Sequence, residues 1–224
     1  QRWPAMLAGV ALQGARIWIA LPKQSKAGVT GDVLLTHRGL SGPAALDLSG
    51  TVAQLLKQGR AVPVRIEVVG GMDISRWRQQ MEAWRTTDGG RRVAALLQKT
   101  LPASLARVVC DLAGVPEPTT AANLSAAARD KLTDLLGGLP LNITDTEGFE
   151  TAFVTRGGVK LKEVDPATLQ SRLLDGLLLT GELLDLDGPT GGYNLQWAFA
   201  SGWLAGRSVG PGQLQGNTHP RIQG

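Results

Sequence analysis

The period of the hydrophobic residues changes twice along this chain, and the two changes constrain its fold more than any single motif. Residues 61–69 alternate between hydrophobic and other side chains, which is typical of a β-strand with one buried face. Residues 73–138 instead carry a helical stripe, which begins with Ile74, Trp77, Met81 and Trp84. β-type content returns in residues 139–144 and 151–155. The pattern therefore predicts an α+β fold in which an all-helical unit is inserted into a β-rich domain.

Prolines and glycines mark the ends of the other expected elements. Residues 6–21 and 31–35 have β-type content, and a proline at the first helical turn predicts a helix over residues 43–57. Within the helical unit, a proline opens and a glycine closes a helix over residues 102–114. A further helix over residues 125–136 ends at two consecutive glycines. The first part of the chain is thus expected to be mainly β-structure, followed by several short helices.

The formal net charge of +4 raises the question of a nucleic-acid partner. Basic residues gather between Arg76 and Arg107, but acidic residues and hydrophobic core positions are interspersed with them. No repeat of basic and aromatic residues emerges there. We therefore predict a solvated helical face and no nucleic-acid partner. A steep loss of affinity with salt would be the signature of the opposite case.

A single cysteine, Cys110, lies in an apolar pattern and is expected to be a small buried residue. One cysteine forms neither a disulfide framework nor a metal-binding cluster, so we predict no metal site. No apolar run approaches the roughly 20 residues that span a bilayer. We therefore expect no membrane association and a cytoplasmic location.

The C-terminal part predicts a strand, a glycine turn and a helix in succession. Residues 177–179 are consecutive leucines, as in a parallel strand that is covered on both faces. Residues 188–192 contain three glycines, whose missing side chains let a flat ligand approach the backbone. Small residues then recur at every fourth position, so one side of the helix could lie close against a sheet: Ala198, Gly202 and Gly206. A helix N-terminus of this kind suits an anionic or electron-rich ligand, although a purely structural βα unit remains open.

Four motifs in a fixed order resemble one known family. They are LLTHRGLSGP (residues 34–43), VTRGGV (residues 154–159), EVDP (residues 163–166) and GELLDLDGPTGGYNLQ (residues 181–196). Together they resemble the BaiN-type flavoproteins, a family of NAD(P)/FAD-dependent oxidoreductases that includes proteins named aminoacetone oxidases. Four ordered motifs are far more specific than one glycine turn.

This resemblance implies an FAD-binding α/β domain that is interrupted by a barrel-like β-domain with a helical insert. It divides the chain into the first part of the β-rich domain (1–72), the helical insert (73–138), the return of the β-rich domain (139–167) and the C-terminal piece of the FAD-binding domain (168–224). It also implies FAD as cofactor, NAD(P)H as a candidate electron donor and a small-molecule substrate.

One expected feature of such flavoproteins does not occur in the sequence. Dinucleotide-binding flavoproteins hold the FAD pyrophosphate at a G-x-G-x-x-G turn, and none occurs among the 224 residues. We therefore expect this chain to be the C-terminal part of a longer flavin-dependent oxidoreductase, with the N-terminal FAD-binding half of the same protein as its partner. The part alone is expected to be inactive and to bind FAD weakly or not at all.

The resemblance assigns the expected FAD contacts to two loops and a helix start. These residues are Gly157, Gly158, Gly181, Glu182, Asp187, Gly188, Thr190, Gly191, Gly192, Tyr193, Asn194 and Leu195. Related flavoproteins place an acid that bonds the ribityl chain where Glu182 stands, although a surface acid is the plain alternative. His37 and Arg38 are weaker candidates that would face the cofactor or substrate cavity, and the catalytic residues stay unassigned.

Other classes of function fit the sequence less well. A serine hydrolase would need a G-x-S-x-G turn, and the chain has neither this turn nor a P-loop. The acidic residues near Asp185 lack the downstream oxygen ligands of a calcium-binding EF-hand. The remaining alternative is a non-enzymatic interaction module, in which the helical unit docks a protein and the glycine motif is structural.

Overall fold

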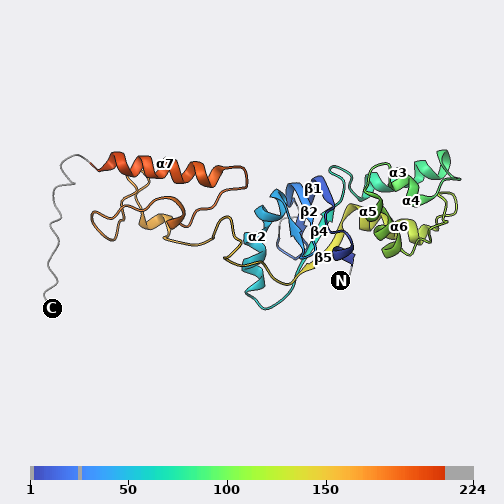
Figure 1. Cartoon of the computed structure of the whole chain (residues 1–224), viewed down its shortest axis with the longest axis horizontal. Helices are drawn as coiled ribbons and strands as arrows, with labels where there is room; N and C mark the ends of the chain where they lie inside the picture. The colour runs from blue at the N-terminus through green and yellow to red at the C-terminus, as the bar shows by residue number, and fades with distance from the viewer. Residues whose placement is uncertain (1–2, 25–26, 210–224) are drawn as a thin grey trace. The chain divides into compact units, whose positions relative to one another are not determined.

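The computed structural model describes residues 3–24 and 27–209 of the chain. The chain divides between Thr146 and Glu147 into two compact units, and each unit has its own hydrophobic core. Strands and helices both contribute to the first unit, so the expected α+β class is confirmed (Figure 1). The finer division into four parts remains a prediction.

The first unit is built on an antiparallel sheet of five strands in the order β3-β2-β1-β4-β5. Its strands are β1 (Ala11–Ile19), β2 (Val29–Leu35), β3 (Leu40–Ser41), β4 (Val62–Glu67) and β5 (Leu139–Ile143). A short helix, α1 (Trp3–Met6), precedes β1. The strands expected near residues 6–21, 31–35, 61–69 and 139–144 are therefore confirmed.

Side chains on the two faces of β1 have different surroundings because successive residues of a strand point to opposite faces. Ile17 and Ile19 belong to the hydrophobic core. Arg16 lies on the opposite face and pairs across the strands with Glu67 of β4. The guanidinium group of Arg16 also lies 4.6 Å from the centroid of the Trp18 ring. The sheet thus has one hydrophobic face and one face that carries a part-buried ion pair.

Helix α2 (Pro43–Leu56) contacts β1 and β2 and covers part of the hydrophobic face of the sheet. Its buried residues recur at every fourth position: Ala44, Leu48 and Val52. Gly42 precedes the helix with a φ of 93°, and a Cβ atom there would lie 2.6 Å from the carbonyl oxygen of Asp32. Glycine is therefore required at this close approach of helix and strand.

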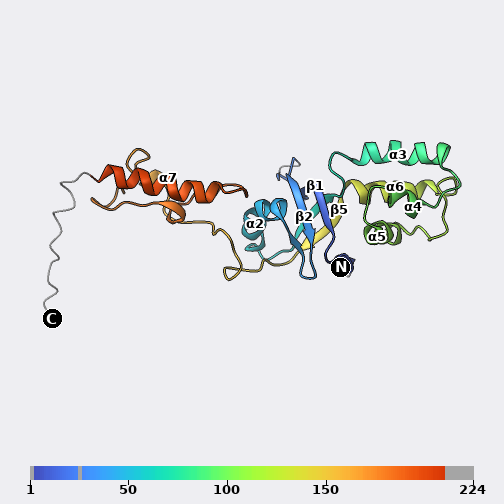
Figure 2. The same cartoon turned by 45° about the horizontal axis from the view of Figure 1, so that its top comes forward.

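Four helices lie between β4 and β5 in the sequence: α3 (Ile74–Thr87), α4 (Val93–Leu97), α5 (Ala103–Ala113) and α6 (Ala126–Gly137) (Figures 1 and 2). Asp73 and Ser125 cap α3 and α6, since their side chains accept hydrogen bonds from backbone N–H groups of the first turns. Gly114 ends α5 in the left-handed conformation. The helices expected from the sequence are thus confirmed.

Helices α3 and α6 pack closely against each other. Three of the four stripe residues of α3 are buried: Trp77, Met81 and Trp84. Ile74, the fourth, is exposed, although it adjoins Gly137, where a Cβ atom would lie 2.6 Å from Ile74 Cγ1. The helical period therefore identifies the buried face but extends it one turn too far.

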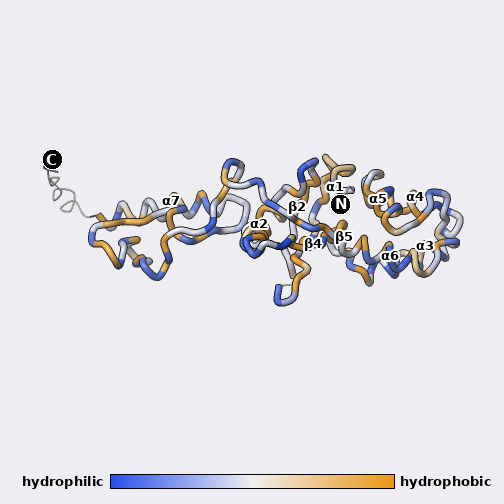
Figure 3. The backbone as a smooth tube through the Cα atoms, turned by 90° about the horizontal axis from the view of Figure 1, so that it is seen from below, coloured by the Kyte–Doolittle hydropathy of each residue, from blue (hydrophilic) through white to orange (hydrophobic). Residues whose placement is uncertain are grey.

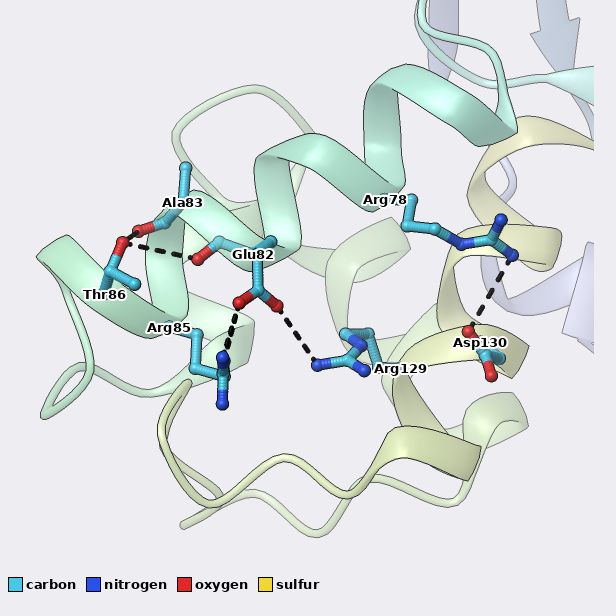
Figure 4. A network of polar contacts seen from close by, with 7 residues as sticks. All are labelled: Arg78, Glu82, Ala83, Arg85, Thr86, Arg129 and Asp130. Carbon is cyan, nitrogen blue, oxygen red and sulfur yellow. Dashed lines mark hydrogen bonds and ion pairs between the residues drawn. The ribbon is translucent and has the colours of Figure 1, made fainter.

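Charged residues join the outer surfaces of α3 and α6 (Figure 4). Glu82 forms an ion pair with Arg85 of its own helix and another, at 3.3 Å, with Arg129 of α6. Arg78 and Asp130 form a longer pair at 3.8 Å. The Arg85 side chain, with help from Arg129, lowers the pKa of Glu82. These exposed pairs match the solvated face expected from the sequence and contribute little to stability.

Cys110 is buried in α5, and burial, with a smaller effect of the Asp111 charge, raises the pKa of its thiol to about 11. We therefore expect the folded chain to resist alkylation by iodoacetamide at pH 8, because the thiolate is the reactive form. Mass spectrometry would show labelling only after unfolding in guanidinium chloride. Rapid labelling of the folded chain would contradict this placement of the thiol.

The second unit has few regular elements. They are two short 3₁₀ turns, η1 (Leu161–Glu163) and η2 (Gly181–Leu183), and the helix α7 (Tyr193–Ser208). Its small core is formed by Val164, Leu169, Leu184 and Ala205. Among the helices of the described residues, none combines the length and the apolar character needed to cross a membrane.

Three expectations for the second unit are wrong. Residues 177–179 form no strand and make only an isolated bridge through Leu178, because the described part of this unit offers no parallel strands to flank them. Residues 151–155 are exposed and also form no strand. The small-residue side of α7 is exposed as well, and Cβ atoms at Gly202 and Gly206 would meet no neighbour within 4 Å. The residues 210–224 of the expected C-terminal part lie outside the described residues.

Candidate functional site

Two loops that the sequence analysis selected lie side by side in the second unit. Val159 forms a parallel bridge with Leu184. The Val159 N–H donates to the Leu183 carbonyl oxygen, and the Asp185 N–H donates to the Val159 carbonyl oxygen, both at 2.9 Å. The loop around Gly157 and the segment that follows Gly181 are thus in direct contact, although these two glycines are 24 positions apart in the sequence.

Side chains reinforce this contact on both sides of the glycines. The Glu182 carboxylate accepts hydrogen bonds from the backbone N–H of Thr155 and from its hydroxyl, the latter at 2.7 Å. Arg156 forms an ion pair with Asp187, with 3.2 Å between Nε and Oδ1. The predicted residues Glu182 and Asp187 therefore bind the neighbouring loop in this structure.

Gly158 lies where the two backbones approach most closely. Its φ is +140°, and a Cβ atom there would lie 2.5 Å from the carbonyl oxygen of Leu183. Gly157 has a φ of +109°, but a Cβ atom there would meet nothing within 4 Å. Gly158 is therefore required for packing, whereas Gly157 leaves its backbone open to a ligand.

The side chain of Asn194 helps to hold the glycine turn before α7. Asn194 accepts a hydrogen bond from the Gly188 N–H at 2.8 Å and donates one to the Gly188 carbonyl oxygen at 2.9 Å. Gly192 adopts a left-handed conformation with a φ of 91° directly before the helix. This reciprocal pair fixes the turn over residues 188–192, including Thr190 and Gly191, against the first turn of α7.

The first turn of α7 presents backbone donors. Its Tyr193, Asn194 and Leu195 N–H groups have no acceptor within the helix, as at any helix N-terminus. The Tyr193 and Leu195 side chains are exposed. The helix dipole adds partial positive charge at this end, which would stabilise an anionic or electron-rich ligand.

Two residues that the sequence analysis did not select hold α7 to the preceding loop. The Ser201 hydroxyl accepts a hydrogen bond from the Gly181 N–H at 2.9 Å, and the Trp197 indole N–H donates to the Gly181 carbonyl oxygen at 3.1 Å. Trp197 and Ser201 are four residues apart, so they share one helix face. That spacing is the signal that could have identified them.

Comparison with known proteins places the first unit in a family. The sequence model of a family described as HI0933-like protein barrel and H2TH domain matches residues 2–154. The chain belongs to the HI0933-like family. The match covers the sheet and helices α1 to α6 and ends directly before Thr155, at the start of the site loop.

Curated relatives extend the similarity into the second unit. The chain is 36% identical over 195 residues to the 3-dehydro-bile acid delta(4,6)-reductase of Clostridium scindens, a match that covers 87% of the chain and 48% of that protein. It is 29% and 30% identical to the ribosomal RNA dihydrouridine synthases of Haemophilus influenzae and Escherichia coli, over 79% and 80% of the chain and 42% of each relative. The HI0933-like chain therefore spans about half the length of the curated relatives it matches.

His37 and Arg38 lie in the first unit, at the exposed tip between β2 and β3. The Thr36 hydroxyl oxygen accepts hydrogen bonds from the N–H groups of Arg38 and Gly39, at 3.2 and 3.0 Å, and thereby shapes the turn. The remaining candidates lie in the second unit, so a role of His37 and Arg38 near a cofactor stays a prediction.

No metal centre is evident in the described part of the chain. No three His, Cys, Asp or Glu side chains gather there in an arrangement that could hold a metal ion. The carboxylates of the site, Glu182 and Asp187, instead face Thr155 and Arg156.

The contact between Thr155 and Glu182 should depend on pH. The hydrogen bond from the Thr155 N–H, followed by that from its hydroxyl, lowers the pKa of Glu182 below its ordinary value. A carboxyl group with a lowered folded-state pKa stabilises the fold above its ordinary pKa, and this contribution is lost as the pH falls through the folded value. NMR titration should therefore show the Thr155 amide shift moving together with the Glu182 carboxyl at a pH below 4.5. A Glu182 carboxyl group that titrates at its ordinary pKa would contradict the contact with Thr155.

Proposed function

We propose that this chain is part of a flavin-dependent oxidoreductase and that residues 155–158 and 181–195 form part of its FAD-binding surface. The observation that carries the proposal is the glycine turn fixed by Asn194 at the start of α7. It leaves open backbone next to the donors of the first helical turn. One relative is named a reductase, and two others are named dihydrouridine synthases. All three names describe reductions, which supports this class of reaction.

The residues of this surface fit a flavin. A Cβ atom at Gly157 or Gly192 would meet nothing within 4 Å, so a flat ring system could approach the backbone at both positions. The first-turn N–H groups of α7 would bind the electron-rich edge of the ring and stabilise negative charge on it. FAD supplies the hydride or electron transfer, whereas these residues bind and orient it.

The pyrophosphate of FAD requires a second surface. The chain contains no G-x-G-x-x-G turn, which holds the pyrophosphate in dinucleotide-binding flavoproteins. The remaining part of a full-length protein, an N-terminal FAD-binding half, would supply it. The chain alone is therefore expected to bind FAD weakly or not at all.

Helix α7 supports the need for such a partner segment. A helix that is hydrophobic on most sides is normally buried. Hydrophobic residues extend along α7 (Figure 3), but Phe199 is 74% exposed and Trp203 is 63% exposed. We propose that the FAD-binding half covers this face. This reading is preferred over a non-enzymatic interaction module because it accounts for both the glycine turn and the exposed helix.

The substrate defines two versions of this function. One is a small molecule with a reducible double bond, by analogy with the bile-acid reductase. The other is a uridine in ribosomal RNA, by analogy with the dihydrouridine synthases, and the net charge of +4 is compatible with it. We favour the small molecule, because basic side chains of the helical unit such as Arg78 and Arg85 are paired with acids. NAD(P)H as electron donor and a cytoplasmic location complete the proposal.

The first test is the visible absorption spectrum of the purified product of the complete reading frame. Oxidised protein-bound flavin bands are expected in the wild type. Asn194→Ala should lower the flavin content severalfold, because it removes both bonds to Gly188. Asn123→Ala, the same change at an exposed asparagine of the first unit without a side-chain hydrogen bond among the described residues, is the matched control. A colourless wild-type protein that also fails to bind added FAD would overturn the proposal.

A further inference from the structure

We propose that Glu182 is a positioning residue that holds the loop of Gly157 and Gly158 in place. This inference rests on the proposed function, because it assigns a role within the same surface. It adds a structural role to the ribityl-binding role that the resemblance implies for an acid at this position.

The contacts of Glu182 carry the proposal. One carboxylate oxygen, Oε1, accepts hydrogen bonds from both the N–H and the hydroxyl of Thr155. Two donors of the same residue define both the distance and the direction of the loop relative to residues 181–187. Hydrogen bonds to a charged acceptor are stronger than those between neutral groups.

The rest of the loop depends on this contact. Thr155 and Arg156 belong to no helix or strand and are exposed. The ion pair of Arg156 with Asp187 is partly exposed, and such pairs restrain a chain weakly. A Cβ atom at Gly157 would meet nothing within 4 Å, and glycine has the largest backbone freedom to lose on ordering. Two backbone hydrogen bonds join the loop again at Val159, so Glu182 fixes the other end of the glycine pair.

Limited proteolysis reports on this role without a cofactor. Trypsin cleaves after arginine, and cleavage needs a loop that can open. In the 224-residue chain, Glu182→Ala should increase the rate of cleavage after Arg156 about fivefold or more, as followed by mass spectrometry. Glu182→Gln should remain closer to the wild type, because its amide oxygen can still accept the Thr155 hydrogen bonds. Asp175→Ala, an exposed acid of the same unit without a side-chain contact among the described residues, should leave the rate unchanged.

Flavin binding separates positioning from direct contact. In the product of the complete reading frame, Glu182→Ala should weaken FAD binding and Glu182→Gln should largely restore it, in parallel with the cleavage rates. Weaker FAD binding with unchanged cleavage after Arg156 would overturn the inference, since Glu182 would then act on the cofactor without holding the loop. Unchanged cleavage and unchanged FAD binding would overturn it too. If no variant and no wild-type protein binds FAD but Glu182→Ala still opens the loop, the proposed function fails while the positioning role stands.

Discussion

Replacement of Arg16 by methionine is expected to destabilise the first unit by about 2–3 kcal/mol, because it leaves the buried carboxylate of Glu67 without this partner. Nε and Nη2 of Arg16 donate to Oε2 of Glu67 at 3.0 and 2.7 Å, and the Glu67 side chain is only 4% exposed. Urea denaturation followed by circular dichroism would measure the change.

The double variant Arg16→Met/Glu67→Leu should recover most of the lost stability, because it removes both charges from the sheet. Arg78→Met is the control, since its pair with Asp130 is exposed and 3.8 Å long. It should change stability by less than about 0.5 kcal/mol. Equal effects of Arg78→Met and Arg16→Met would contradict the conclusion that the part-buried ion pair stabilises the first unit.

Trp77→Ala is expected to cost about 3–5 kcal/mol, the usual range for removing a buried aromatic side chain. Trp77 is 1% exposed, and its ring packs edge to face against Trp84 with 6.5 Å between centroids. Thermal unfolding followed by circular dichroism would show a lowered transition for the first unit.

Trp77→Phe should cost much less than Trp77→Ala. The indole Nε1 of Trp77 is buried and has no hydrogen-bond partner among the described residues, so its removal sacrifices no hydrogen bond. Trp203→Ala, on the exposed face of α7, should leave the transition of the first unit unchanged. A Trp77→Phe variant as unstable as Trp77→Ala would show that the indole N–H does have a partner.

The sequence was most informative where a segment finds its neighbours within the described chain. The alternation around Ile66 predicts β4 correctly, because β1 and β5 are both present to pair with it. The leucines at 177–179 are equally hydrophobic, but the described part of the second unit contains no flanking strand that could pair with them. Hydrophobicity identifies what can be buried, whereas burial itself depends on the surface that covers it.

The candidate site shows a similar division. The motifs shared with the flavoprotein family identified glycine positions such as Gly158 and Gly192, which adopt positive φ values. The side chains that hold these glycines in place were harder to predict. Thr155 and Glu182 are 27 residues apart, and no local period links two such positions. Only the folded backbone brings their donor and acceptor atoms together.

The pairing of β4 with β5 has a consequence for how this architecture can change. Ile66 lies opposite Leu139, so residues 68–138 leave the sheet and return to it at neighbouring points. In topological terms the helical unit is an enlarged hairpin connection. The entropy of closing such a connection rises only logarithmically with its length. Lineages could therefore shorten, extend or exchange these helices while the strand order of the sheet is kept.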